Sequence, residues 1–89
     1  MNVKLLYTGI GVIIGDVAEN ETGYLVTDPL AVVFSEKGFM LQDIFIGTAE
    51  TENLTTLTLD KLQVIGKPLE PHVAIRNNYT QTVGGIQLV

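Results

Sequence analysis

Short runs of β-branched, leucine and aromatic residues, each ended by a turn rich in glycine, asparagine or proline, fill residues 1–66 of this 89-residue chain. Runs of four to eight such residues between turn signals are typical of β-strands. The runs are Val3 to Tyr7, Val12 to Val17, Tyr24 to Phe34, Phe39 to Ile46, and Leu57 to Ile65. We therefore predict a mainly β fold with five strands.

Two residues predict where these strands are irregular. Gly15 lies inside the second run, where glycine lowers stability unless the strand bends sharply or another backbone comes close. We assign Gly15 as the structural glycine of a strongly bent strand, which a small barrel requires. Pro29 interrupts the third run and has no N–H donor, so it predicts either a sheet edge or a bulge in a long third strand.

The C-terminal segment changes period. Pro71 suits the first turn of a helix, and Ile75, Tyr79 and Val83 recur at the spacing of one helix face before Gly84 and Gly85. Such a short, Asn- and Thr-rich helix is unstable alone, so it must dock through that stripe. The chain is then a single domain, 1–89, with a barrel over about 1–66, a helix over about 70–83 and an extended tail over 84–89.

Composition predicts an oligomer. The chain is 46% hydrophobic and 17% charged, against an average of about 25% charged, so it has too few polar side chains to cover a small monomer. The fourth run is apolar on both faces, and both must be covered. We expect copies to pair edge to edge through this run and the end of the fifth. The predicted interface residues are Phe39, Leu41, Ile44, Ile46, Leu62 and Val64.

No catalytic or metal-binding motif is recognisable. The glycines from Gly9 to Gly15 have the wrong spacing for a dinucleotide loop and lead into a strand, not a helix. His72 and Ser35 are the only residues of their kinds, and nothing suggests that they meet. Without cysteine there is no ordinary structural zinc site, and the acidic run 50–53 lacks the spacing of a calcium loop. We predict a non-enzymatic protein without a cofactor.

Charge and hydropathy restrict partners and location. The net charge of −5 argues against a broad electrostatic grip on nucleic acid or anionic lipid. No apolar run approaches the roughly 18–20 residues that span a bilayer. The apolar stretch from Val3 to Ile14 is interrupted by glycines and is not a convincing secretory signal. We predict no membrane association and a cytoplasmic location.

The order of elements resembles the Sm-like (LSm) family. The likeness rests on the opening strand with its Thr8-Gly9 turn, the bent second strand, and the third-strand sequence Gly-Tyr-Leu-Val-Thr-Asp-Pro-Leu from Gly23 to Leu30. With the closing segment from Pro68 to Tyr79 and a Gly-Gly-Ile tail, it is most similar to phage-borne Sm-like proteins, including those of cyanophages. The resemblance implies an SH3-like, strongly bent, five-stranded open barrel and closed rings of about five to seven identical subunits. For the family at large, it implies RNA binding around the pore.

The chain departs from the family at the RNA site. The places of the Asp and Asn that read uridine fall near Glu21 and Leu25, so the base-reading Asn is absent. Residues Ile75 to Asn78 are similar to the family's Ile-Arg-Gly-Asn motif, but the position of these residues fits the helix better than a strand. Tyr24 could still stack on a base and Lys61 could contact a phosphate of single-stranded RNA.

Two functions therefore stay open: an Sm-like ring that binds RNA or serves as an RNA-associated scaffold, and a phage-encoded structural or protein-binding adaptor ring without nucleic-acid binding. In a phage-encoded protein, the location would be the host cytoplasm.

Overall fold

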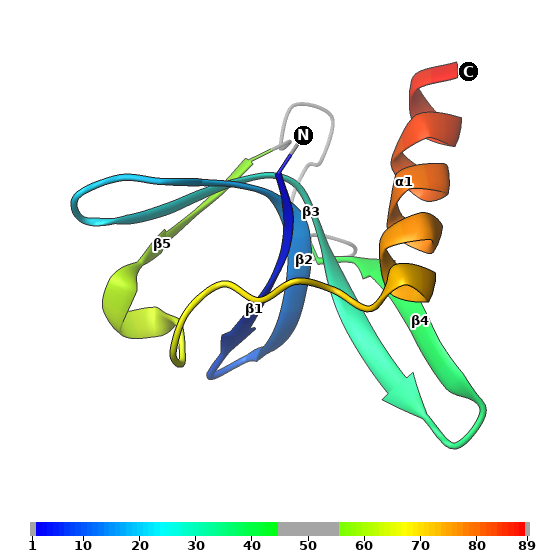
Figure 1. Cartoon of the computed structure of the whole chain (residues 1–89), viewed down its shortest axis with the longest axis horizontal. Coiled ribbons are helices and arrows are strands. Elements are labelled where there is room, and N and C mark those ends of the chain that lie inside the picture. Colours follow the sequence, from blue (N-terminus) through cyan, green and yellow to red (C-terminus); the bar gives the residue numbers. More distant parts are fainter. Residues whose placement is uncertain (1, 45–55, 89) are drawn as a thin grey trace.

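The structure is a computed structural model that describes residues 2–44 and 56–88. These residues form five antiparallel strands in one open sheet, a short 3-10 helix and a C-terminal α-helix (Figure 1). The elements are β1 (Val3–Thr8), β2 (Gly11–Glu19), β3 (Gly23–Ser35), β4 (Gly38–Asp43), β5 (Thr56–Asp60), η1 (Lys61–Gln63) and α1 (Val73–Leu88). The predicted mainly β class with a C-terminal helix is confirmed.

Strand β3 is the centre of the sheet. β2 pairs along one edge of β3, and β1 pairs with the far edge of β2. The other edge of β3 is shared, because β5 pairs with Gly23 to Thr27 and β4 pairs with Leu30 to Ser35. β4 and β5 therefore lie end to end along the same edge of β3. The gap between them is at the middle of β3.

The middle of β3 is a β-bulge. Gly15 of β2 lies opposite two residues of β3, Asp28 and Pro29, so the register shifts by one. Asp28 has φ of 50°, a left-handed conformation that aspartate adopts more readily than most residues, and Pro29 has no N–H to leave unpaired. A Cβ on Gly15 would overlap Val26 and lie 3.1 Å from the Thr27 carbonyl oxygen. The two predicted alternatives for Pro29 are thus resolved in favour of a bulge, and β4 and β5 run in different directions on either side of it (Figure 1).

Both faces of the sheet are apolar, and each carries its own core. Successive side chains of a strand point to opposite faces, so the neighbours Leu5 and Leu6 enter different cores. The helix-side core lies under α1 and contains Val3, Leu5, Ile14, Val32, Ile75, Tyr79 and Val83. The inner core, which the curled sheet encloses, contains Leu6, Ile13, Val17, Tyr24, Val26, Leu59 and Val64.

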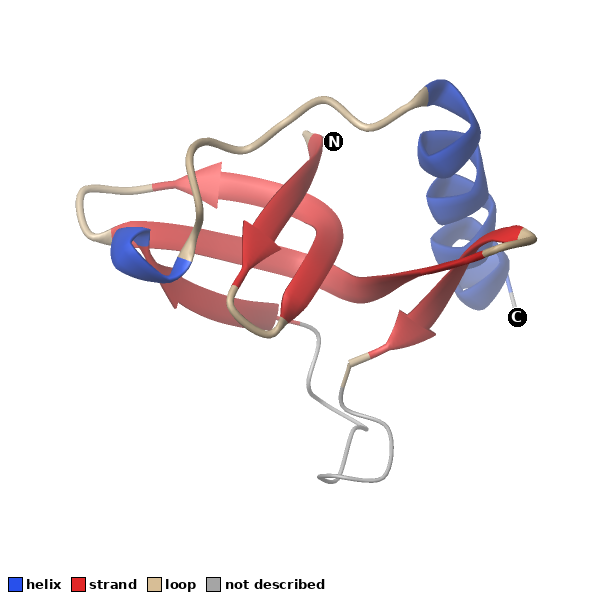
Figure 2. Ribbon diagram, turned by 90° about the horizontal axis from the view of Figure 1, so that it is seen from below, coloured by secondary structure: helices blue, strands red, loops and turns tan. Residues whose placement is uncertain are grey.

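The segment between η1 and α1 runs past the free edge of β1 (Figure 2). Leu69 and Leu5 exchange two backbone hydrogen bonds there, of 2.8 and 2.9 Å. α1 then begins after His72, whose Nδ1 accepts a hydrogen bond from the Ala74 N–H at 3.1 Å. Within the described ranges, no helix is long and apolar enough to cross a membrane.

Two predicted boundaries are wrong. Residues Leu62 to Ile65 do not form a strand, because the chain turns into η1 and only Val64 then makes a bridge, to Thr8. The Gln63 side chain stabilises this turn by accepting a hydrogen bond from the Asp60 N–H at 2.8 Å. The expected extended tail is also wrong, since α1 continues to Leu88. Glycine costs a helix about 1 kcal/mol per residue but keeps its N–H and C=O groups, so Gly84 and Gly85 do not break the ladder.

Candidate functional site

The two predicted RNA contacts, Tyr24 and Lys61, both adjoin Glu19. Tyr24 pairs with Glu19 across the β2–β3 hairpin. Its side chain is only 5% exposed, because alternation along β3 turns it into the inner core. Little of the Tyr24 ring is therefore open for a base to stack on. Lys61 stays at the surface, where its Nζ lies 3.2 Å from the Glu19 carboxylate.

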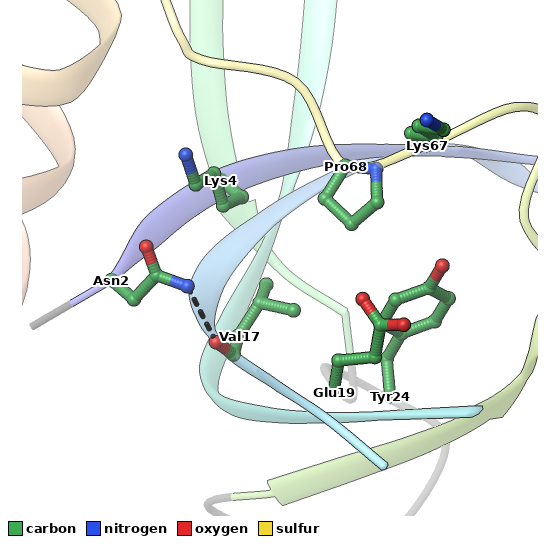
Figure 3. A pocket seen from close by; sticks show the side chains of 7 residues that line it. All are labelled: Asn2, Lys4, Val17, Glu19, Tyr24, Lys67 and Pro68. Atoms are coloured by element: carbon green, nitrogen blue, oxygen red, sulfur yellow. Dashed lines mark hydrogen bonds between the residues drawn. The ribbon is translucent and has the colours of Figure 1, made fainter. Parts of the chain in front are cut away.

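A polar hollow of about 440 Å³ opens beside these residues (Figure 3). Its floor is apolar, with Val17 and the ring of Tyr24, while Lys4 and Lys67 reach its rim from β1 and from the segment after η1. The Asn2 amide donates a 2.9 Å hydrogen bond to the Val17 carbonyl and ties the start of the chain to β2. The lining residues are Asn2, Lys4, Val17, Glu19, Tyr24, Lys67 and Pro68.

The charge around this hollow is largely neutralised. Lys4 forms an ion pair with Glu70, and Lys61 pairs with Glu19. Lys67 alone of these three lysines has no ion-pair partner among the described residues. One unpaired lysine suits a single phosphate or carboxylate, whereas tight nucleic-acid binding needs several such contacts. In residues 2–44 and 56–88, no three histidine, cysteine, aspartate or glutamate side chains gather where they could hold a metal ion.

The docking of α1 involves polar contacts that the sequence pattern did not reveal. Glu70 forms ion pairs with both Lys4 and Arg76, which joins β1 to the first turns of α1. Tyr79 is fully buried, and its hydroxyl donates to the Asp28 carbonyl at 2.9 Å. Burial raises the pKa of Tyr79 to about 12, and the nearby charges of Asp28 and Asp16 add to this shift. The periodic stripe predicted the position of Tyr79, but not the partner of its hydroxyl.

The predicted interface residues are not all available for an interface. Phe39 and Leu41 are half-buried against the helix-side core, and Val64 is buried in the inner core. Ile44 is half-buried, and Ile46 lies outside the described residues. Leu62 is 99% exposed and, of the members that the structure describes, is the one that is fully open to a partner. The face of β4 that carries Phe39 and Leu41 is covered by α1, so a neighbouring copy is not needed on that side.

Exposed apolar residues gather in two places instead. The first, here the hairpin patch, lies at the β3–β4 hairpin and consists of Val33, Phe34 and Met40. The second, here the η1 patch, consists of Ile10, Leu62 and Ile65. A groove of about 350 Å³ runs through the η1 patch and is lined by Thr8, Gly9, Ile10, Leu59, Leu62, Gln63 and Ile65. Ile10, an apolar residue beside the predicted Thr8-Gly9 turn, is the sequence signal that could have identified this patch.

Comparison with known proteins adds no family. No protein-family model matches the chain, and no curated protein matches its sequence significantly.

Proposed function

We propose that this protein is a non-catalytic, self-assembling scaffold of the Sm-like kind, in which copies join edge to edge into a closed homo-oligomeric ring. The observation that carries this proposal is the pair of open strand edges. Among residues 2–44 and 56–88, neither β4 from Gly38 to Gln42 nor β5 has a second strand partner. Open edges with neighbouring apolar side chains favour strand addition by another chain.

The directions of the two edges support a ring over a simple pair. β3 bends at its bulge, and β4 and β5 diverge on either side of it (Figure 1). Because the open edges of β4 and β5 point in different directions, one partner copy does not pair with both of them. Pairing β4 of one copy with β5 of the next satisfies both edges in every copy. Such head-to-tail contacts form a ring when the rotation from copy to copy closes, and a closed ring leaves no strand edge open.

RNA binding is the second candidate function. Its support is the polar hollow, which is lined by Lys4 and Lys67 and by Glu19, the ion-pair partner of Lys61. The burial of Tyr24 and the pairing of Lys4 and Lys61 with carboxylates weaken this candidate. We therefore rank the scaffold, including the adaptor form that recruits protein, above the RNA-binding ring.

The test is the mass of the purified protein at micromolar concentration, measured by light scattering after size exclusion. We expect one species whose mass is an integral multiple of 9.7 kDa, at about five to seven copies. A monomer overturns the proposal. Adding single-stranded RNA at low salt to the same sample then decides the second candidate, because a ring that gains no mass is a scaffold without RNA.

A further inference from the structure

Each of the two apolar patches adjoins one of the open edges. Met40 lies on β4 and pairs with Val33, and both are on the opposite face of the sheet from Val32 of the helix-side core. This is the face that carries the inner core. Leu62 comes two residues after the end of β5, beside the groove whose wall includes Leu59. Val33 and Met40 of the hairpin patch are thus on the same face of the sheet as the groove beside η1, whereas Phe34, which pairs with Phe39, is on the helix side.

Antiparallel pairing of these edges between copies brings the patches together. If β4 of one copy runs antiparallel to β5 of the next, the inner-core faces of the two sheets lie on the same side of the joined sheet. Met40 and the neighbour's Leu59 then point to that side. The start of β4, at Gly38, then lies beside the end of β5, at Asp60. Parallel pairing would place Met40 on the face away from Leu59 and leave both patches exposed.

Charge at the same junction agrees with this arrangement. Lys37 lies in the turn before β4, and Asp60 ends β5. Neither side chain forms an ion pair within the described residues. The antiparallel arrangement places the lysine of one copy near the aspartate of the next, and opposite charges at the rim of an apolar contact fix its register.

We infer that the groove beside η1 is the acceptor site for the hairpin patch of a second copy, with Met40 as the inserted side chain. This inference rests on the proposed edge-to-edge assembly and adds to it a donor residue, an acceptor groove and a polarity. Met40 is 55% exposed in the free chain, and methionine adapts its shape to an irregular apolar groove. Insertion removes Met40, Leu62 and Ile10 from water together.

Unique cysteines test the contact, because the natural chain has none. Met40→Cys and Leu62→Cys are made as separate variants, each alone and then co-expressed, and a short bis-maleimide is added. We expect a cross-linked dimer on a denaturing gel only from the co-expressed pair. Asn78→Cys, exposed on α1, replaces Leu62→Cys as the matched control and gives no dimer with Met40→Cys.

The mass of each sample separates the possible failures. An oligomer without the mixed cross-link overturns the groove assignment and leaves the scaffold proposal in place. A monomer overturns both. A dimer formed by Met40→Cys alone shows a symmetric contact between hairpins, which also overturns the inference. Met40→Asp gives an independent readout, since we expect it to lower the oligomer mass while Thr80→Asp on α1 leaves the mass unchanged.

Discussion

The Tyr79 hydroxyl donates a 2.9 Å hydrogen bond to the carbonyl oxygen of Asp28, a residue 51 positions earlier in the chain. The same hydroxyl lies 3.3 Å from the carbonyl of Thr27. A bulge removes backbone groups from the strand ladder, and buried carbonyls without partners are costly. The helix therefore caps the bulge of β3 as well as covering the sheet, and Tyr79 couples the two elements.

Tyr79→Phe should lower the free energy of unfolding by about 1–3 kcal/mol. The substitution keeps the buried ring but leaves the carbonyls at the bulge without their donor. Chemical denaturation measures the change, and Tyr7→Phe, at a half-exposed position, is the matched control with little effect. Equal stability of the Tyr79→Phe variant and the natural protein would show that water replaces the hydroxyl.

Stability should fall at high pH through the same residue. The pKa of Tyr79 is about 12 in the folded protein and 10.0 when unperturbed, so the unfolded chain loses this proton first. The stabilising contribution of the neutral phenol is complete below pH 10 and is lost as the pH rises towards 12. Denaturation curves from pH 9 to 12 should show a steeper loss for the natural protein than for Tyr79→Phe. Parallel pH profiles would contradict the buried, neutral phenol.

Gly15→Ala should destabilise the protein by about 1–3 kcal/mol. The added Cβ overlaps Cγ1 of Val26, so this fully buried side chain must shift within the inner core. Gly9→Ala is the matched control, because its added Cβ meets nothing within 4 Å. Thermal unfolding of both variants measures the difference. A Gly15→Ala variant as stable as Gly9→Ala would place the close approach of the two strands elsewhere.

If the ring binds single-stranded RNA, Lys67 should carry one phosphate contact. Lys67→Ala then reduces the slope of log affinity against log salt by about 0.7, the value for one phosphate on a single strand. Titration at several salt concentrations gives the slope. Asn77→Ala, at an exposed position of α1 away from the hollow and from both strand edges, should leave the slope unchanged. Equal slopes for all three proteins would remove the hollow as an RNA contact.

Features set by neighbours in the chain could be predicted before the structure. β-branched runs between turns indicated the strands, and the spacing of Ile75, Tyr79 and Val83 indicated the face of α1 that is buried. Gly15 and Pro29 indicated an irregularity in two paired strands, where the bulge lies. These signals are local, because periodicity and the allowed φ angles of glycine and proline depend on a few adjacent residues.

Sequence patterns gave wrong predictions at residues whose environment depends on contacts with other segments of the chain. Tyr24 looked like an exposed platform, yet its pairing with Leu59 of β5 turned it into the inner core. Leu62 looked like strand material, but the turn made by Asp60 and Gln63 placed it in solvent. Strand pairing, the face that each strand presents and the partner of the Tyr79 hydroxyl depend on contacts between residues far apart in sequence. Only the tertiary structure decides these contacts, since their free energy comes from burying both partners at once.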